Sequence, residues 1–324
     1  MPLGVVVLAN KPPSAFCVCL CLPVSAFPVC RDRHHAAMDL TADLVVREPC
    51  KLGEGPRWSV RDRCLWWVDI RGHRVLRWDP ASGDLRTWPV PADIGFLAER
   101  TQGGLIVGLR DGLYAFNPGT GACTALGATH AHDPAGFRFN DGACDAAGRL
   151  WVGTIGPKGQ AHLYRFDPGL ARTTFRSDVT VSNGIAWSPD GTSMYYIDTP
   201  SQVVMAYPFA EENGTLGEGR VAITIPNEIG HPDGCCIDAE GMLWVCLWNG
   251  GAVLRCDPAT GKTLARITIP GARNVTACSF GGPDLDTLYI TTAGGGDPQQ
   301  PENAGCLFAA QPGVHGLPWH AFAG

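Results

Sequence analysis

The sequence contains no run of basic residues and no basic amphipathic stretch, and its formal net charge is −6 over 324 residues. Nucleic acids and anionic membranes attract positively charged surfaces, so these absences argue against both as partners. The apolar run from Ala15 to Phe27 is interrupted by Pro23 and is too short to span a bilayer. A small neutral or anionic ligand remains compatible with this composition.

The cysteines lack the spacing of a metal site, because no C-x-x-C pair occurs among the 14 present. Four of them crowd the first 30 residues, and the other ten are scattered along the chain. Scattered cysteines in strand-like runs are typical of buried, reduced thiols in the cytoplasm. We therefore expect free thiols and a cytoplasmic location.

The first 37 residues differ in character from everything that follows them. Their apolar run is preceded by one positive charge, Lys11, and by a proline pair, which makes a poor signal peptide. We expect residues 1–37 to be an N-terminal extension, either disordered or the product of a misassigned start. Met38 then opens a single domain that covers residues 38–324.

Helical periodicity is also absent, whereas glycine and proline are frequent, at 41 and 26 residues. This composition predicts many short strands separated by turns. A short apolar triplet that follows a turn recurs six times, at intervals of 40, 45, 44, 49 and 45 residues. The triplets are centred on Leu65, Leu105, Leu150, Met194, Leu243 and Leu288.

A repeat of about 40 to 50 residues that contains several short strands is the signature of a β-propeller blade. Six repeats predict an all-β fold, a six-bladed β-propeller. We expect residues 39–49 to close the ring by pairing with the last repeat, whose outer strands include residues 305–311. Such closure protects the edges of the sheets.

Four repeats carry a carboxylate or a carboxamide 10 or 11 residues before the repeat marker. These residues are Glu54, Asn140, Asn183 and Asp233. Each is followed by glycine, at once or one residue later, which we interpret as clearance for a ligand. The second and sixth repeats offer Ile94–Gly95 and Thr276–Ala277 instead, which are poor ligands.

The first strand of each propeller blade lines the central channel, so the four polar residues are expected to meet at one mouth. Two carboxylates and two carboxamides suit a hard divalent cation better than a soft one. A single Asn-Gly or Asp-Gly pair more often forms an ordinary turn. Four such residues at one offset favour a shared site.

The same segments resemble the family of gluconolactonase, regucalcin and the bacterial pentonolactone hydrolases. The resemblance covers the chain from about residue 44 onward, and its ordered motifs are specific. The matching motifs are LGEGPRW (52–58), WWVDI (66–70), RFNDG (138–142), SNGIAWSPDG (182–191), YYID (195–198), HPDGCCIDAEGMLWV (231–245) and SFGG (279–282).

Carried over residue by residue, the resemblance makes Glu54, Asn183 and Asp233 the protein ligands of one divalent metal. It makes Arg138 and Asn140 substrate-binding residues. The offset had grouped Asn140 with the metal ligands, and we follow the resemblance in moving it to the substrate.

The resemblance also puts Asp141 beside the substrate-binding pair. The chain after Val152–Thr154 is shorter than the acidic loop of some family members, so the hydroxyl groups recognised can differ. Asp69 and Asp198 either support the ligands from behind or hold strand-end turns.

The implied activity is hydrolysis of an aldonolactone, with the metal as Lewis acid and Asp233 positioning or activating water. Two alternatives keep the metal: a non-catalytic divalent-metal-binding regulator and a paraoxonase-like esterase. A third, an interaction propeller of the WD-repeat kind, would not need these ligands. The metal could be Ca²⁺, Mn²⁺, Fe²⁺ or Zn²⁺. We expect a monomer or a weak oligomer.

Overall fold

The computed structural model of the protein describes residues 38–130, 132 and 135–324. The predicted extension, residues 1–37, lies outside the described residues. No helix in the described part is long and apolar enough to cross a membrane.

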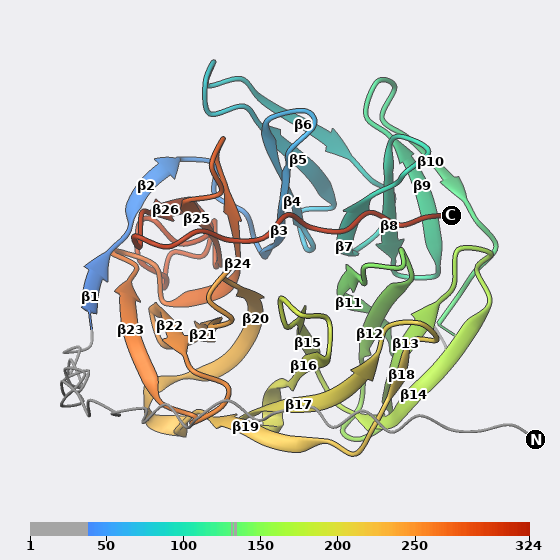
Figure 1. The fold of residues 1–324 in the computed structure, drawn as a ribbon. Helices are drawn as coiled ribbons and strands as arrows, with labels where there is room; N and C mark the ends of the chain where they lie inside the picture. The colour runs from blue at the N-terminus through green and yellow to red at the C-terminus, as the bar shows by residue number, and fades with distance from the viewer. Residues whose placement is uncertain (1–37, 131, 133–134) are drawn as a thin grey trace, which may run out of the picture. The chain divides into compact units, whose positions relative to one another are not determined.

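The first three blades each contain four antiparallel strands that follow one another in the chain (Figure 1). Blade one comprises β3 (Gly53–Ser59), β4 (Cys64–Asp69), β5 (Arg74–Trp78) and β6 (Leu85–Pro89). Blade two comprises β7 (Ile94–Glu99), β8 (Leu105–Leu109), β9 (Leu113–Asn117) and β10 (Ala122–Ala125). Blade three comprises β11 (Arg138–Cys144), β12 (Leu150–Ile155), β13 (Ala161–Phe166) and β14 (Arg172–Val179).

The other three blades follow the same plan with small additions. Blade four comprises β15 (Ser182–Trp187), β16 (Ser193–Asp198), β17 (Val203–Ala210), β18 (Thr215–Leu216) and β19 (Arg220–Thr224). Blade five comprises β20 (His231–Ile237), β21 (Leu243–Trp248), β22 (Ala252–Cys256) and β23 (Thr263–Thr268). Blade six comprises β24 (Asn274–Gly281), β25 (Thr287–Ala293) and β26 (Leu307–Ala310). Two 3₁₀ turns, η1 (Thr199–Ser201) and η2 (Asn227–Ile229), complete the elements.

The predicted six-bladed β-propeller is confirmed. The first strand of every blade contacts the first strands of both neighbouring blades, so the six strands surround a central channel. Each apolar marker predicted from the repeat lies in the second strand of its blade, and all six markers are buried. The repeat therefore reports the position at which a blade packs against its neighbours.

The ring closes through the segment predicted for that purpose, but in two steps. The strand β2 (Asp43–Val46) pairs antiparallel with β26 and completes blade six, as expected. The preceding strand β1 (Met38–Thr41) pairs parallel with β23 and adds a fifth strand to blade five. The closing segment thus ties two neighbouring blades together.

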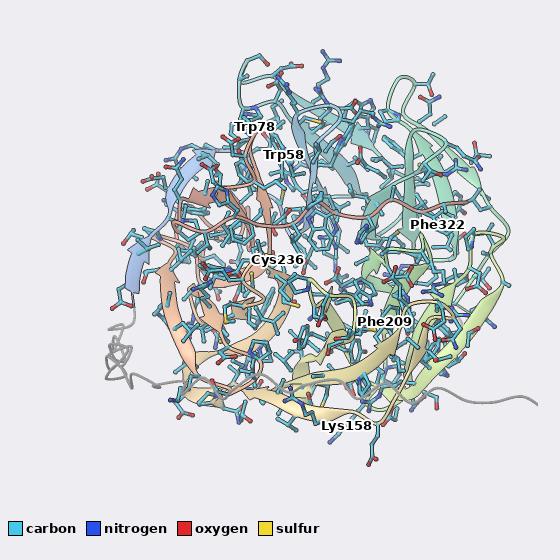
Figure 2. All side chains as sticks on the ribbon, in the orientation of Figure 1. Trp58, Trp78, Lys158, Phe209, Cys236 and Phe322 are labelled. Atoms are coloured by element: carbon cyan, nitrogen blue, oxygen red, sulfur yellow. The ribbon has the colours of Figure 1, made fainter. Side chains whose placement is uncertain are left out.

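The core lies between neighbouring blades, because each buried hydrophobic cluster combines residues of two of them. Figure 2 draws the described side chains on the six blades. Trp66, Trp151 and Trp244 are each buried in a cluster shared with the following blade. The ten described cysteines are free thiols, and all except Cys123 are buried. Thiols here serve as small apolar core residues.

Residues 315–324, which we call the C-terminal strap, cross the end of the channel opposite the start of the first strands. In Figure 1 the strap is the dark red segment that runs from β24 toward β8. Its two ends are fixed by backbone hydrogen bonds: Gly316 binds Leu285 in blade six, and Phe322 binds Glu99 in blade two. The strap therefore bridges the ring across the channel.

Candidate metal centre

Every first strand is interrupted by a β-bulge at the same level of the channel. The pairing register with the second strand shifts at Glu54/Arg57, Ile94/Phe96, Phe139/Gly142, Ser182/Ile185, Pro232/Cys235 and Val275/Ala277. A bulge leaves residues outside the hydrogen-bond ladder and re-aims their side chains, and bulges are frequent beside functional sites.

The residues at these bulges are the ones that the offset count selected. Glu54, Asn140, Asn183 and Asp233 lie at the bulges of blades one, three, four and five. The bulges of blades two and six hold Gly95 and Thr276 instead. The structure therefore brings the four polar residues to equivalent positions at one mouth of the channel.

The glycines beside these polar residues differ in what surrounds them. A Cβ atom on Gly184 would lie 2.7 Å from the Cys235 Sγ atom of the next blade, and one on Gly234 would lie 2.7 Å from Ala277 Cβ. These glycines let neighbouring first strands approach each other closely. Gly55 differs, because it adopts a positive φ of 52° with open space around it. At Gly184 and Gly234 the small residue therefore makes room for the neighbouring strand, whereas at Gly55 it leaves open space.

Three carboxyl groups are buried close together at this level: Glu54, Asp141 and Asp233. Burial, and then the charge of Asp141, raise the pKa of Glu54 to about 8. Burial and the charges of Glu54 and Asp141 raise the pKa of Asp233 well above its ordinary value. Such mutual repulsion is costly for a metal-free protein and disappears when a cation binds between the carboxylates.

Of these three groups, Asp141 is the one in an ion pair, since Arg57 Nη2 lies 3.5 Å from its Oδ1 atom. Glu54 and Asp233 form no ion pair with any lysine, arginine or histidine in the described part of the chain. Buried charges are normally paired or bound to metal. Two buried carboxylates without a cationic partner therefore fit a divalent cation.

The two asparagines differ in what their side-chain oxygens are free to do. Asn140 Oδ1 accepts a hydrogen bond from Arg138 Nη1 at 2.5 Å, and its Nδ2 donates to Ser182 O and to Asn183 Oδ1. Asn183 Nδ2 in turn donates to Thr199 Oγ1 at 2.7 Å. Among the described residues, Asn183 Oδ1 accepts a hydrogen bond from Asn140 only, so it retains a lone pair for a cation. The Asn140 oxygen already binds Arg138.

Arg138 is held in a buried, charged surrounding. Burial, and then the nearby Arg71 cation, lower its pKa to about 10. Its Nε atom lies 4.0 Å from Asp93 Oδ2, and Asp93 also pairs with His73 Nε2 at 2.8 Å and with Arg110. The guanidinium is therefore fixed between the carboxyl cluster and this outer group of charges.

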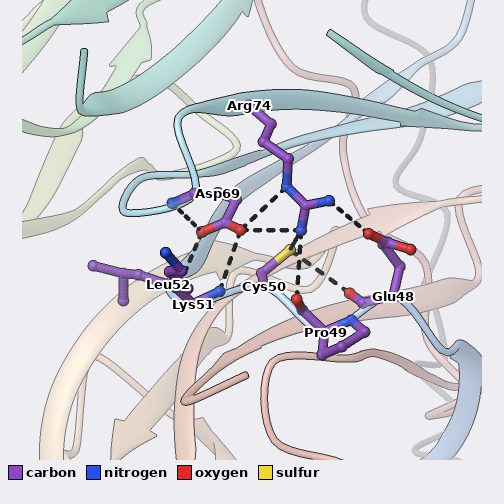
Figure 3. A network of polar contacts seen from close by, with 8 residues as sticks. Glu48, Pro49, Cys50, Lys51, Leu52, Asp69 and Arg74 are labelled. Atoms are coloured by element: carbon purple, nitrogen blue, oxygen red, sulfur yellow. Dashed lines mark hydrogen bonds and ion pairs between the residues drawn. The ribbon is translucent and has the colours of Figure 1, made fainter. Parts of the chain in front are cut away.

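Asp69 and Asp198 hold the backbone that leads into two of these strands. Asp69 accepts hydrogen bonds from the backbone N–H groups of Lys51 and Leu52 and from Arg74, as Figure 3 shows. Asp198 accepts equivalent bonds from Thr180 and Val181, directly before β15. Each aspartate therefore lies at the end of its own strand and also holds the backbone segment that leads to a predicted ligand, Glu54 or Asn183.

Arg57 fills the channel beneath the carboxyl cluster. It donates to Gly142 O at 2.9 Å, pairs with Asp141, and stacks on Trp319 of the C-terminal strap at 3.8 Å from the ring centroid. Asp141 thus faces this arginine. These contacts connect blades one and three with the C-terminal strap, on the side of the carboxyl cluster that lies away from the start of the first strands.

Sequence reasoning missed Arg57, Asp93 and Arg110. Arg57 lies inside a quoted motif, and its spacing from Glu54 could have drawn attention to it. Asp93 and Arg110 lie at strand ends of blade two, where the offset count found no ligand. No group of three His, Cys, Asp or Glu residues forms a metal site within the described ranges. The predicted set contains an asparagine, so it has only two such residues.

Residues 52–294 match the protein family described as the SMP-30/Gluconolactonase/LRE-like region. Among curated relatives, 6-deoxy-6-sulfogluconolactonase of Pseudomonas putida is 38% identical over 300 residues, which cover 89% of this chain and 100% of that protein. Regucalcin of Xenopus laevis is 36% identical over 295 residues, covering 87% and 98%.

A solved structure gives the same picture in three dimensions. The calcium-binding protein regucalcin from Agrobacterium tumefaciens superimposes with a TM-score of 0.82 at 29% identity, covering 88% of this chain and 98% of that one. The likeness therefore extends over nearly the whole propeller.

Proposed function

The chain belongs to the SMP-30/gluconolactonase/LRE-like family, and from this membership we propose that it hydrolyses a sugar lactone with the help of one divalent metal ion. The observation that carries the proposal is the pair of buried carboxylates, Glu54 and Asp233, neither of which forms an ion pair with a residue that the structure describes. The name of the Pseudomonas putida relative supports lactone hydrolysis, and the similarity to a regucalcin described as a calcium-binding protein supports the metal.

We assign the metal to Glu54, Asn183 and Asp233. Their oxygens form a hard donor set that suits Ca²⁺ or Mn²⁺ and also binds Fe²⁺ or Zn²⁺. A bound divalent ion supplies a Lewis acid that stabilises the negative charge developing on the lactone carbonyl oxygen. Asn140 supports this assignment, because its donated hydrogen bond fixes the orientation of the Asn183 amide.

Asp233 is the residue that we assign to proton transfer. Its carboxylate accepts a proton from the water that attacks the lactone carbonyl carbon, and then returns that proton to the ring oxygen. The bond from the carbonyl carbon to the ring oxygen breaks, which gives the aldonic acid. Arg138 and Asn140 hold the hydroxyl groups and the carbonyl end of the lactone, with Asp141 behind them.

A pH-stat assay with a panel of aldonolactones tests the proposal directly. The panel contains glucono-, arabino- and xylonolactone and a simple aromatic lactone, each with chelated protein and with protein reconstituted with single metals. We expect hydrolysis of at least one sugar lactone that depends on added metal. Hydrolysis of the aromatic lactone alone would favour a paraoxonase-like esterase.

A non-catalytic calcium-binding regulator is the second candidate, because a similar solved structure is described as a calcium-binding protein. Both candidates predict metal binding, so binding alone does not separate them. Metal binding without acceleration of any lactone over its spontaneous hydrolysis would favour the regulator and overturn the enzyme.

A further inference from the structure

A pocket opens at the mouth of the channel beside the proposed metal centre. Its volume is about 240 Å³. Its walls are formed by Arg71, Arg110, Gly136, Phe137, Arg138, Ile155 and Gly156. The three arginines come from different blades: Arg71 follows β4, Arg110 follows β8, and Arg138 begins β11. Three guanidinium groups therefore converge on a space that none of the three blades encloses alone.

Among the described residues that line this pocket, three are arginines and none is acidic. Asp93 is the carboxylate that contacts the arginines, with Arg110 in an ion pair and Arg138 Nε at 4.0 Å. Glu54 also acts on Arg138, but we have assigned that carboxylate to the metal. Among the described residues, Asp93 thus contacts two of the three guanidinium groups, those of Arg110 and Arg138.

Of the three arginines, Arg71 has no contact with the described residues that would explain its position by a role in stabilising the fold. It is exposed and makes no hydrogen bond or ion pair with the residues that the structure describes. It is nevertheless close enough to Arg138 for its charge to lower the pKa of that group. Like charges in proximity destabilise the folded protein, so their convergence calls for an anion.

Arg138 links the pocket to the proposed metal centre through a chain of hydrogen bonds. Arg138 lines the pocket and donates to Asn140, and Asn140 donates to Asn183. A substrate that reaches from the metal across Asn140 would place its far end among the arginines. The aromatic wall on this side is fixed, because Phe137 stacks on His132 with ring centroids 4.2 Å apart.

We propose that the lactone substrate carries an anionic group at the end remote from its carbonyl, and that Arg71 and Arg110 bind this group, while Arg138 lies between it and the lactone ring. The inference rests on the proposed function and names the substrate class of the same site. A sulfonate, a phosphate and a carboxylate share the required chemistry, since guanidinium groups form paired, charge-assisted hydrogen bonds with all three. Arg71 is then a specificity-determining residue.

Kinetics with matched lactones test the proposal. Glucono-1,5-lactone is compared with its counterparts that carry a phosphate, a sulfonate or a carboxylate at the sixth carbon, and the three anionic arms identify the group preferred. We expect the metal-loaded protein to favour at least one anionic lactone by about tenfold or more in kcat/KM. Arg71→Gln should reduce this preference about tenfold, mainly through KM, and Arg71→Lys should reduce it less.

Arg61→Gln is the matched control. Arg61 is also an exposed arginine of blade one, but it lies in the turn after β3, at the opposite end of the blade. It changes the net charge by the same amount and should leave the preference unchanged. An unmodified protein that prefers the neutral lactone, or an equal preference in Arg71→Gln and the unmodified protein, would overturn the proposal.

Calorimetry separates this proposal from the proposed function. Gluconate and 6-phosphogluconate, the corresponding acids, are titrated into the metal-loaded protein and into Arg71→Gln. If no lactone is hydrolysed but 6-phosphogluconate binds about tenfold more tightly than gluconate in an Arg71-dependent manner, the anion site stands and the lactonase proposal fails. Equal binding of both acids would overturn the anion site.

Discussion

The side-chain amide of Asn140 donates a hydrogen bond to Asn183 Oδ1 across the boundary between blades three and four, at 2.9 Å. Asn183 passes the connection on to Thr199, whose hydroxyl donates to Pro232 O in blade five at 2.7 Å. Three blades therefore share one chain of hydrogen bonds. The offset that grouped Asn140 with the ligands is explained, because Asn140 occupies the same bulge position and serves its neighbour.

Replacing Asn140 by alanine should weaken metal binding although Asn140 is not assigned as a ligand. The Asn183 amide loses the donor that fixes its orientation, and Arg138 loses an acceptor. We expect metal affinity to fall severalfold and kcat/KM to fall about tenfold or more, since each lost buried hydrogen bond costs about 1 kcal/mol or more. Calorimetric titration with Ca²⁺ measures the first effect, and unchanged affinity would contradict it.

Asp233→Ala should abolish turnover and weaken metal binding together. The change removes a ligand and the group assigned to proton transfer, whereas Asp233→Asn keeps the shape and loses only the charge. Glu240→Gln is the control, because Glu240 is an exposed carboxylate in the turn between β20 and β21 of the same blade. Lactonase activity at the original level in Asp233→Ala would rule out the assignment.

Gly184→Ala should destabilise the propeller without changing the charge of the site. The added Cβ would lie 2.7 Å from Cys235 Sγ and 3.0 Å from Asp233 O, so blade five must move. Overpacking of this kind costs about 1–3 kcal/mol. Gly169→Ala is the control, because a Cβ there meets nothing within 4 Å. Equal unfolding midpoints of the two variants in urea would contradict the prediction, because they would show that the boundary between blades four and five accommodates the added methyl group.

His132, which stacks on Phe137, should make the free energy of unfolding fall in mild acid. Burial, and then His162, lower the pKa of His132 to about 4. The unfolded chain takes up this proton near the ordinary pKa of about 6.5, which the folded chain resists. Stability is therefore complete above about pH 6.5 and is lost progressively as the pH falls toward 4.

Urea unfolding at several pH values from 7 to 4.5 measures this loss. His132→Phe keeps a ring stacked on Phe137 and removes the titrating group, so its unfolding free energy should depend less on pH. An identical pH dependence in the variant and the unmodified protein would assign the loss to other groups.

Much of the fold was predictable because each blade repeats one strand-turn pattern with a short apolar second strand. The marker residues Leu65 to Leu288 are buried in every blade for the same packing reason, so their spacing reveals the ring. The parallel pairing of β1 with β23 was not predictable, because four residues of an edge strand carry too little pattern to select a partner.

The candidate site was predictable only in part. The equivalence of Glu54, Asn183 and Asp233 follows from sequence spacing, since bulges at one level preserve the offset. The hydrogen bonds that distinguish Asn140 from Asn183 depend on which blades are neighbours and on how the amides are oriented. The arginine pocket depends on turns of three blades that share no motif, so only the folded ring brings Arg71, Arg110 and Arg138 together.

The closure of the ring also sets an order of events during synthesis. β2 leaves the ribosome before any blade is complete, but its partner β26 is made more than 250 residues later. Until then β2 and the most recently made strand present unpaired edges, with which other chains can pair. If synthesis stalls before β26 is made, most blades can be formed while β2 still has no partner. Such a nascent chain exposes unpaired strand edges and is a substrate for chaperones.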